Sequence, residues 1–221
     1  LQSVDWMSVE HRMEASRLLD MWQRPENPVL GMELLDVRYH ECRVRSWAVG
    51  CLRSLSDEEL LTLAMNVEAQ VINVPTGAQD YRPALYGGVS AVELGVAGVR
   101  RVPLAIDRAS LEHRLVLAYT GASRNSGINN WDVMVRRING DADVAAAFDA
   151  IRDAAIGVRE ALEQKDWSTV AACMAAEWQA RKRLAPGVTT REIDTLLERA
   201  RFCGALAGKV CGAGGGGCLV C

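Results

Sequence analysis

The stretch "KVCGAGGGGC", residues 209–218, is the first feature of the sequence that could do chemistry, because it places five glycines within six positions. Glycine loses more conformational freedom on folding than any other residue, so a run of glycines is unfavourable unless the fold requires it. The run follows an apolar, strand-like segment. Two interpretations are open: a flexible tail, or a loop whose bare backbone approaches the phosphates of a ligand.

The glycine run can be compared with two known phosphate-binding motifs. The glycines formally satisfy the G-x-G-x-x-G spacing of dinucleotide sites, but that motif needs a following helix and an acidic residue about 20 positions later. The sequence shown ends at Cys221, and no Lys-Ser or Lys-Thr follows the glycines as a Walker loop requires. We therefore predict a nest of backbone amides that approaches phosphate or supports a neighbouring phosphate loop. The nest consists of Gly212, Ala213, Gly214, Gly215, Gly216 and Gly217.

Two further groups of polar residues could take part in phosphoryl transfer. Asp80, in "GAQD", carries a carboxylate that could remove a proton from a hydroxyl, although an ordinary turn aspartate is the alternative. A polar cluster past a predicted strand could bind the hydroxyls and phosphate of a sugar, with an arginine as the anion ligand. The alternative there is a solvated loop before an asparagine helix cap. The cluster consists of Ser123, Arg124, Ser126, Asn129 and Asn130. Lys209 either faces the site or lies along a strand edge.

Composition excludes several classes of protein. The net charge is −3 and the sequence has no dense basic stripe, so we expect no nucleic-acid partner. We also expect no membrane partner, since no apolar run reaches the roughly 18 residues of a membrane helix. The N-terminus does not resemble a signal peptide, which favours a cytoplasmic location. Seven cysteines form no regular framework, and Cys218–Cys221, although C-x-x-C in form, is not expected to bind zinc or to act in redox chemistry.

The first part of the sequence, residues 1–55, is predicted to be helical only. "WMSVEHRMEASRLLDMW" is amphipathic and ends before two prolines, and "LGMELLD" and "CRVRSWAVGCLRSL" follow. The third segment places one apolar face inward, formed by Val44, Ala48, Cys51 and Leu55. Paired short helices of this kind indicate a helical-repeat element, and plain core packing is the alternative.

Residues 56–221 are predicted to form a second, mixed part. Ser56 and Glu59 form a capping box that opens a helix ending at "VPTG". Strands are predicted near "SAVEL", "VRRVPLAI" and "RLVLAYTG", and again ahead of the glycines. Thr189 and Glu192 are predicted to form a second capping box. The helix that Asp141 caps is expected to bury a stripe of Val144, Phe148, Ile151, Ala155, Val158 and Leu162. This order predicts an α+β fold, a ferredoxin-like α/β sandwich with helices on one face and a helical N-terminal segment.

Several of these motifs occur together, in order, in a known family. The glycine run is similar to the third signature motif of the GHMP kinases, a superfamily of small-molecule kinases. "NVEAQVINVPTGAQDYRPALYGGV" resembles the segment around the catalytic aspartate of that family. "LVLAYTGASRNSGINNW" and "EWQARKRLAPGVTTREIDTLLERARFCGALAGKVCGAGGGGC" resemble the branch that includes the heptose 7-phosphate kinases. The resemblance covers residues 56–221. "GMELLDVRYHECRVRSWAVGCL" resembles instead the helical domain of phosphoinositide 3-kinases, over about residues 30–60.

The GHMP resemblance implies an ATP-dependent kinase of a sugar or sugar phosphate that uses Mg²⁺. It implies that Asp80 stands near the acceptor hydroxyl while the γ-phosphate is transferred. The sequence departs from the family in two respects. It contains no "GLGSS"-like loop, which in the family opens a helix and holds the ATP phosphates. It also lacks the N-terminal strands of the family, which hold a basic residue near the phosphates. Two functions therefore stay open, an incomplete GHMP-type kinase and a non-catalytic module that binds sugar phosphate or interacts through its helices. Association of two copies of the chain as a homodimer also stays open.

Overall fold

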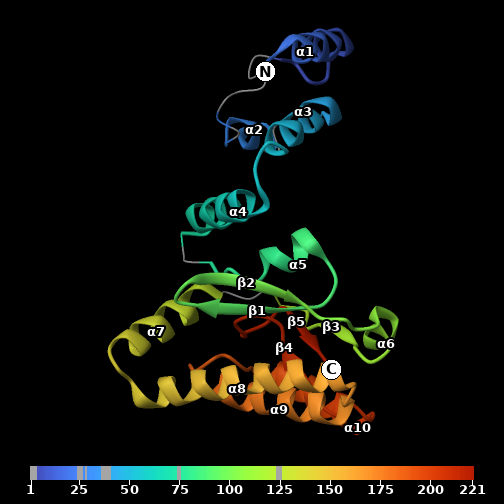
Figure 1. The fold of residues 1–221 in the computed structure, drawn as a ribbon. Coiled ribbons are helices and arrows are strands. Elements are labelled where there is room, and N and C mark those ends of the chain that lie inside the picture. The colour runs from blue at the N-terminus through green and yellow to red at the C-terminus, as the bar shows by residue number, and fades with distance from the viewer. Residues whose placement is uncertain (1–3, 24–26, 28, 36–40, 74–75, 123–125) are drawn as a thin grey trace. The chain divides into compact units, whose positions relative to one another are not determined.

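The computed structural model describes residues 4–23, 27, 29–35, 41–73, 76–122 and 126–221. The chain divides into two compact units, Leu1–Tyr81 and Arg82–Cys221 (Figure 1). The sequence predicts a boundary after residue 55, where the resemblance changes from one family to the other. That boundary stays a prediction. No helix in the described part of the chain is long and apolar enough to span a membrane.

The first unit is built from helices. They are α1 (Val9–Met21), α2 (Val29–Glu33), α3 (Cys42–Leu52) and α4 (Asp57–Ile72), and α5 (Tyr81–Tyr86) begins at the boundary of the unit. The described residues before Leu55 contain no strand, so the predicted helical N-terminal segment is confirmed. Ser56 and Glu59 form the predicted capping box at the start of α4, and Asn73 ends that helix in the left-handed conformation with φ +56°.

The core of the first unit lies on one face of α3. Val44, Ala48 and Cys51 are fully or almost fully buried, as the spacing predicted. Leu55, the fourth predicted member of this face, lies beyond the end of α3 and is only partly buried. A Cβ atom added at Gly31 would stand 2.9 Å from the Cβ atom of Cys51, so α2 approaches α3 too closely for any larger residue. Leu19 of α1 packs in the same cluster as Val44.

The second unit contains two antiparallel sheets. Strands β1 (Ser90–Gly95) and β2 (Gly98–Pro103) form a hairpin. Strands β3 (Leu117–Tyr119), β4 (Lys209–Val210) and β5 (Cys218–Val220) form a second sheet in the order β3-β5-β4. All strands predicted from the sequence are present. Because β5 is central and pairs with β4, the glycine run between these two strands is the loop of a hairpin.

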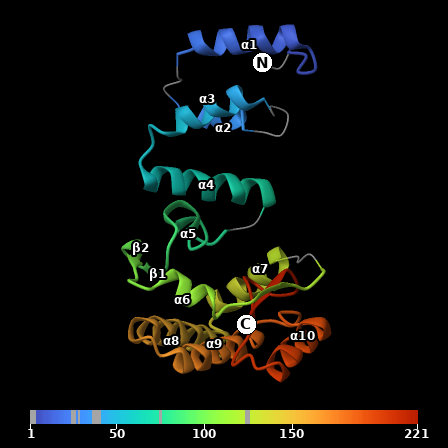
Figure 2. The same ribbon diagram turned by 90° about the vertical axis from the view of Figure 1, so that its right-hand side faces the viewer.

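Five helices complete the second unit: α6 (Arg108–Glu112), α7 (Ser126–Ile138), α8 (Ala142–Gln164), α9 (Trp167–Lys182) and α10 (Arg191–Phe202). The two longest, α8 and α9, lie side by side as an antiparallel pair (Figures 1 and 2). Lys165, with φ +57°, makes the tight turn between them. Helices packed against a small antiparallel sheet give the α+β class that the sequence predicts.

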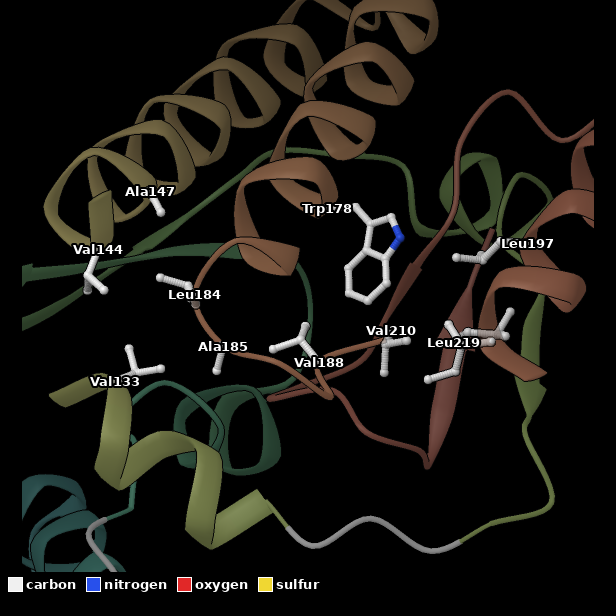
Figure 3. Packing of buried hydrophobic residues seen from close by; sticks show 11 residues of the cluster. Val133, Val144, Ala147, Trp178, Leu184, Ala185, Val188, Leu197, Val210 and Leu219 are labelled. Carbon is white, nitrogen blue, oxygen red and sulfur yellow. The ribbon is translucent and has the colours of Figure 1, made fainter. Parts of the chain in front are cut away.

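A single hydrophobic cluster joins these helices to the sheet of β3, β4 and β5. Trp178 of α9 lies at its centre with 1% of its surface exposed, and Figure 3 shows its ring between the helical layer and the strands. Ile193 and Leu197 of α10 contribute from one side, and Val210 of β4 and Leu219 of β5 contribute from the sheet. This cluster fixes the two strands that carry the glycine loop.

The buried stripe of α8 differs from the prediction at two positions. Phe148 is 39% exposed and Ala155 is exposed, whereas Ala147 and Ala154 are buried. The reason is the close approach of α9: a Cβ atom added at Gly157 would stand 2.7 Å from the Sγ atom of Cys173. Only a face of small residues allows such an approach, so the alanines turn inward and the larger phenylalanine turns outward.

The predicted second capping box is also wrong, by one residue. Thr190, not Thr189, is the N-cap of α10, and its hydroxyl accepts a hydrogen bond from the amide of Ile193. Thr189 instead donates a side-chain hydrogen bond to Asp194 at 2.7 Å. Thr189 fits the capping-box pattern with Glu192, whereas Thr190 has Ile193 three residues later and caps the helix through its hydroxyl alone. Ile193 is fully buried in the core, and this packing accompanies the shift of the cap by one residue.

The start of α8 yields a prediction about pH. Asp141 accepts hydrogen bonds from the amides of Asp143 and Val144 and forms an ion pair with Arg136 at 2.7 Å. The amide of Val144 first, and Arg136 second, lower the pKa of the Asp141 carboxyl below its ordinary value of 3.8. Since the pKa is lower in the folded than in the unfolded state, the carboxylate stabilises the fold above pH 3.8, and this stabilisation disappears as the pH falls through the folded pKa.

We expect Asp141→Ala to lower the melting temperature at pH 7 by about 2–4 °C, because cap and ion pair are both lost. Asp141→Asn, which keeps a capping oxygen, should lose less and should flatten the decline in stability below pH 4. Thermal unfolding from pH 2 to 7 measures both effects, with Asp143→Asn in the same helical turn as the control. An acid decline that is equally steep in Asp141→Asn contradicts the assignment.

Candidate functional site

The glycine loop, residues 212–217, has a defined backbone that favours glycine at every position except that of Ala213. Its five glycines all have positive φ, with values of +78°, +98°, +77°, +145° and +79° along the loop. Side chains of L-residues collide with the backbone in this region, which is why glycine recurs at these positions. The run is therefore a tight hairpin loop between β4 and β5, and the interpretation as a flexible tail falls away.

The centre of the glycine loop packs directly on the loop that precedes α10. A Cβ atom added at Gly214 would stand 2.4 Å from the carbonyl oxygen of Val188, which leaves no space for a side chain. The amide of Gly215 donates a hydrogen bond to that same oxygen at 2.9 Å. The middle of the glycine loop is thus held by backbone contacts alone.

The end of the glycine loop is tied to the chain beyond β3. The amide of Gly217 donates to the carbonyl oxygen of Ala122 at 2.9 Å, and the carbonyl oxygen of Gly217 accepts from the amide and the hydroxyl of Thr120 at 2.9 and 2.8 Å. Ala122 immediately precedes the polar cluster that begins at Ser123. The backbone that leads into this cluster therefore lies against the end of the glycine loop.

A charged cluster lies at the start of the glycine loop. Glu177 of α9 has only 7% of its surface exposed, and its carboxylate binds two cations. Arg181, one turn later on α9, donates to one carboxylate oxygen at 2.5 Å. The Nζ atom of Lys209 lies 2.6 Å from the other oxygen, in a geometry that suits an ion pair rather than a directed hydrogen bond. Arg181 also reaches the carbonyl oxygen of Gly212 at 3.4 Å.

Lys209 thus faces α9 and does not merely extend along a strand edge. Burial lowers the pKa of its ammonium group, and the close carboxylate of Glu177 acts in the opposite direction. The sequence analysis missed Glu177 and Arg181. Their spacing of four residues on a predicted helix was the available signal, because it places an acid and a base on one helical face.

Asp80 lies in the first unit, in the exposed turn before α5. The hydroxyl of its neighbour Tyr81 donates to the carboxylate of Glu68 on α4. Burial first, and this contact second, raise the pKa of the Tyr81 hydroxyl. The hydroxyl of Thr76 bonds to the carbonyl oxygen of Met65 at 3.3 Å, so two contacts fasten the Asp80 turn to α4.

The other predicted site residues lie in the second unit. Ser123 and Arg124 fall outside the described residues. Ser126, Asn129 and Asn130 lie in the first part of α7, and Asn130 is exposed. Within the second unit, the hydrogen bond from Gly217 to Ala122 is what connects the glycine loop with this segment. Asp80 and the glycine loop belong to different units.

The sequence resemblance implies ATP and Mg²⁺. The described residues include a backbone suited to the phosphates of ATP, but they do not form a site for the metal on their own. The glycine loop offers bare backbone, and Gly212 at its start is exposed, as close approach to phosphates requires. No group of three or more His, Cys, Asp or Glu side chains that could hold a metal ion occurs in the described ranges. Kinases bind Mg²⁺ through one or two carboxylates together with the phosphates, so such a cluster is not required.

A cavity of about 570 Å³ opens elsewhere in the second unit. Its walls come from α6, β3, α9, α10 and β5 and are mainly apolar. Arg114 lies at its edge and stacks on the ring of Trp167 at 4.4 Å. None of the predicted site residues lines this cavity. Sugar and phosphate groups need several polar partners, so the glycine loop is the better candidate site.

Two family models match the chain. Residues 158–221 match the model for the GHMP kinases C terminal, which includes α9, α10 and the glycine loop. Residues 1–70 match the model for the phosphoinositide 3-kinase family accessory domain.

Curated relatives give the same two similarities. The chain is 31% identical over 169 residues to a D-glycero-alpha-D-manno-heptose 7-phosphate kinase of Campylobacter jejuni, an alignment that covers 74% of this chain and 49% of that kinase. It is 33% identical over 170 residues to a mevalonate kinase of Aeropyrum pernix, covering 75% and 49%. Phosphatidylinositol 3-kinase 1 of Dictyostelium discoideum is 38% identical over 65 residues, covering 29% of this chain and 4% of that protein. The chain spans about half the length of the two small-molecule kinases.

Solved structures agree on the fold. The mevalonate kinase of L. major, in complex with R-mevalonate, superimposes with a TM-score of 0.63 at 24% identity, over 80% of this chain and 53% of that one. A Campylobacter jejuni protein whose structure is described as that of a sugar kinase gives 0.55 at 28% identity, over 80% and 50%. The chain is therefore similar to GHMP kinases through its C-terminal part and to the phosphoinositide 3-kinase accessory domain over its first 70 residues.

Proposed function

We propose that residues 56–221 form the acceptor-binding and glycine-loop part of an ATP-dependent kinase of GHMP type, with a sugar or sugar phosphate as the acceptor. The similarity to a heptose 7-phosphate kinase supports this substrate class. The observation that carries the proposal is the glycine loop itself. It is a rigid, positive-φ hairpin whose end is hydrogen-bonded to the residue preceding the polar cluster.

The proposed roles follow from the chemistry of phosphoryl transfer, which depends mainly on positioning and on charge stabilisation. Asp80 accepts the proton of the acceptor hydroxyl, or stabilises it electrostatically, during transfer. Arg124 pairs with the phosphate of the sugar, and Ser123, Ser126, Asn129 and Asn130 bind its hydroxyls. The glycine loop presents its backbone to phosphate. When bound, Mg-ATP supplies the γ-phosphate, and the metal neutralises the charge that develops on it.

A non-catalytic module is the second candidate, and two observations favour it. The 221 residues contain no "GLGSS"-like loop, and residues 1–70 match the accessory domain of a different kinase family. Such a module would bind sugar phosphate through the polar cluster or interact through its helices, without transferring phosphate. Nucleotide binding and phosphoryl transfer distinguish the two candidates.

We predict that the chain binds Mg-ATP weakly or not at all. Without the amides of a loop at a helix N-terminus, the triphosphate lacks contacts that are each worth about 1.5–3 kcal/mol. Losing three such contacts weakens binding by roughly a thousandfold or more. Isothermal titration with Mg-ATP, with and without a heptose or hexose phosphate, measures this. A dissociation constant in the low micromolar range contradicts the prediction and favours a working nucleotide site.

The role of Asp80 has its own test. We expect Asp80→Asn to lower the turnover of any detectable transfer by about 100-fold or more while sugar binding stays nearly unchanged, since the carboxylate acts on the reacting hydroxyl. Arg124→Ala should mainly weaken the affinity for sugar phosphate, because its charge pairs with the ground state.

Asp57→Asn, at another exposed aspartate of the first unit, is the control for these kinetics, and circular dichroism checks the fold. Full turnover in a folded Asp80→Asn variant refutes the role of Asp80. If the wild-type chain transfers no phosphate, its binding of sugar phosphate is measured instead. Binding without transfer favours the non-catalytic module.

The shape of the glycine loop can be tested without any ligand. Gly214→Ala adds a side chain at φ +98° and places its Cβ atom against the carbonyl of Val188. We expect the free energy of unfolding to fall by about 2–5 kcal/mol, from backbone strain and steric overlap together. Gly140→Ala is the matched control, because Gly140 has φ +81° with open space around it, and strain alone costs about 1–2 kcal/mol. Equal losses in urea unfolding would mean that the glycine loop does not pack on Val188.

A further inference from the structure

The glycine loop is held in two different ways along its length. Its middle and its end are fixed by backbone hydrogen bonds from Gly215 and Gly217. Its start, at Gly212, is exposed, and the contact recorded there comes from the side chain of Arg181. Gly212 is the part of the glycine loop that a ligand can reach most easily. The amide of its neighbour Cys211 donates to the carbonyl oxygen of Cys218 at 2.8 Å, so backbone pairing holds the chain up to residue 211, and Arg181 supplies the contact at Gly212 itself.

Arg181 in turn depends on Glu177. The Nε atom of the guanidinium group donates to one carboxylate oxygen at 2.5 Å, and the Nη2 atom lies at ion-pair distance, also 2.5 Å, from the same oxygen. This places the Nη1 atom toward the carbonyl of Gly212. The second carboxylate oxygen holds Lys209, the residue at the start of β4, at 2.6 Å. One buried carboxylate thus contacts, directly or through Arg181, both ends of the segment 209–212.

The charges of this cluster do not cancel. One carboxylate faces two cations, so the cluster keeps one positive charge beside an exposed glycine backbone. The side chains of Arg181 and Lys209 are 24% and 22% exposed, so an approaching ligand can reach both cations. A carboxylate that is 7% exposed is stabilised by these two partners, and removing it leaves two neighbouring cations that repel each other.

We propose that Glu177 is a positioning residue for the glycine loop: through Arg181 it orients the accessible backbone at Gly212, and through Lys209 it supports the start of β4, which is already paired with β5. The two cations also give that backbone a positive charge suited to a phosphate group. This second part rests on the proposed function of the glycine loop, whereas the restraint itself does not.

The restraint is tested by hydrogen–deuterium exchange of the full chain, with peptides covering residues 209–218 compared with peptides from α8. Glu177→Gln removes the charge and keeps the shape of the side chain. We expect exchange in residues 209–218 to become about tenfold faster or more, as expected for the loss of one charge-assisted hydrogen bond, while α8 changes little. Glu163→Gln is the matched control, because Glu163 pairs with Arg159 on α8.

Two further variants separate positioning from general destabilisation. Arg181→Lys keeps a cation beside Glu177 but shortens its reach, so faster exchange should be confined to the start of the glycine loop. Lys209→Arg should behave like the wild type, whereas Lys209→Met should behave like Glu177→Gln. Unchanged exchange in residues 209–218, or an equal rise in every peptide of the second unit, overturns the proposal. If Glu177→Gln does not fold, Arg181→Lys and the Lys209 pair decide the question.

Inorganic phosphate tests the second part separately. We expect it to slow exchange in residues 209–218 of the wild type and to have little effect in Lys209→Met. If the variants alter exchange but phosphate does not, the positioning role stands and the phosphate-facing role of the glycine loop is wrong. If phosphate slows exchange equally in the wild type and in all variants, the cations play no part in anion binding.

Discussion

The pairing of β5 with both β3 and β4 is the constraint on which the second unit depends. These strands are only two or three residues long, so their few ladder hydrogen bonds need support from the core beneath them. Trp178 and its apolar neighbours on α10 supply that support. Because β4 and β5 are adjacent and antiparallel, six residues must reverse the chain, and the positive φ of five of them requires glycine. The shape of the candidate site thus follows from the sheet.

The same pairing explains why charge is buried beside the glycine loop. β4 packs on α9, which places Lys209 opposite Glu177. Burying a carboxylate is unfavourable unless it is paired and hydrogen-bonded, and the two cations provide both kinds of partner. A hydrophobic residue could fill the space equally well. The hydrogen bond from Arg181 to Glu177, however, fixes the direction of the guanidinium group as well as its distance, and Arg181 thereby reaches the backbone of Gly212.

The two halves of the proposed chemistry lie in different units. Asp80 is fastened to α4 through the contacts of Tyr81 and Thr76, in the helical unit. The glycine loop and the segment after β3 lie in the second unit. The contacts that hold Asp80 and those that hold the glycine loop are therefore separate, so a substitution in one unit leaves the contacts of the other in place.

The sequence by itself determined the features that depend on a few neighbouring residues. The capping box of Ser56 and Glu59, the positions of β1 to β4 and the recurrence of glycine within residues 212–217 follow from local hydrogen bonds and backbone sterics. The central strand β5, which follows the glycines, was not predicted. The tertiary structure decided what depends on distant partners. Periodicity could not tell that α9 approaches α8 closely enough to turn Ala147 inward and Phe148 outward. It could not choose Thr190 as the cap or pair Glu177 with Lys209, 32 residues later, because contacts between distant segments leave no periodic signal in either segment.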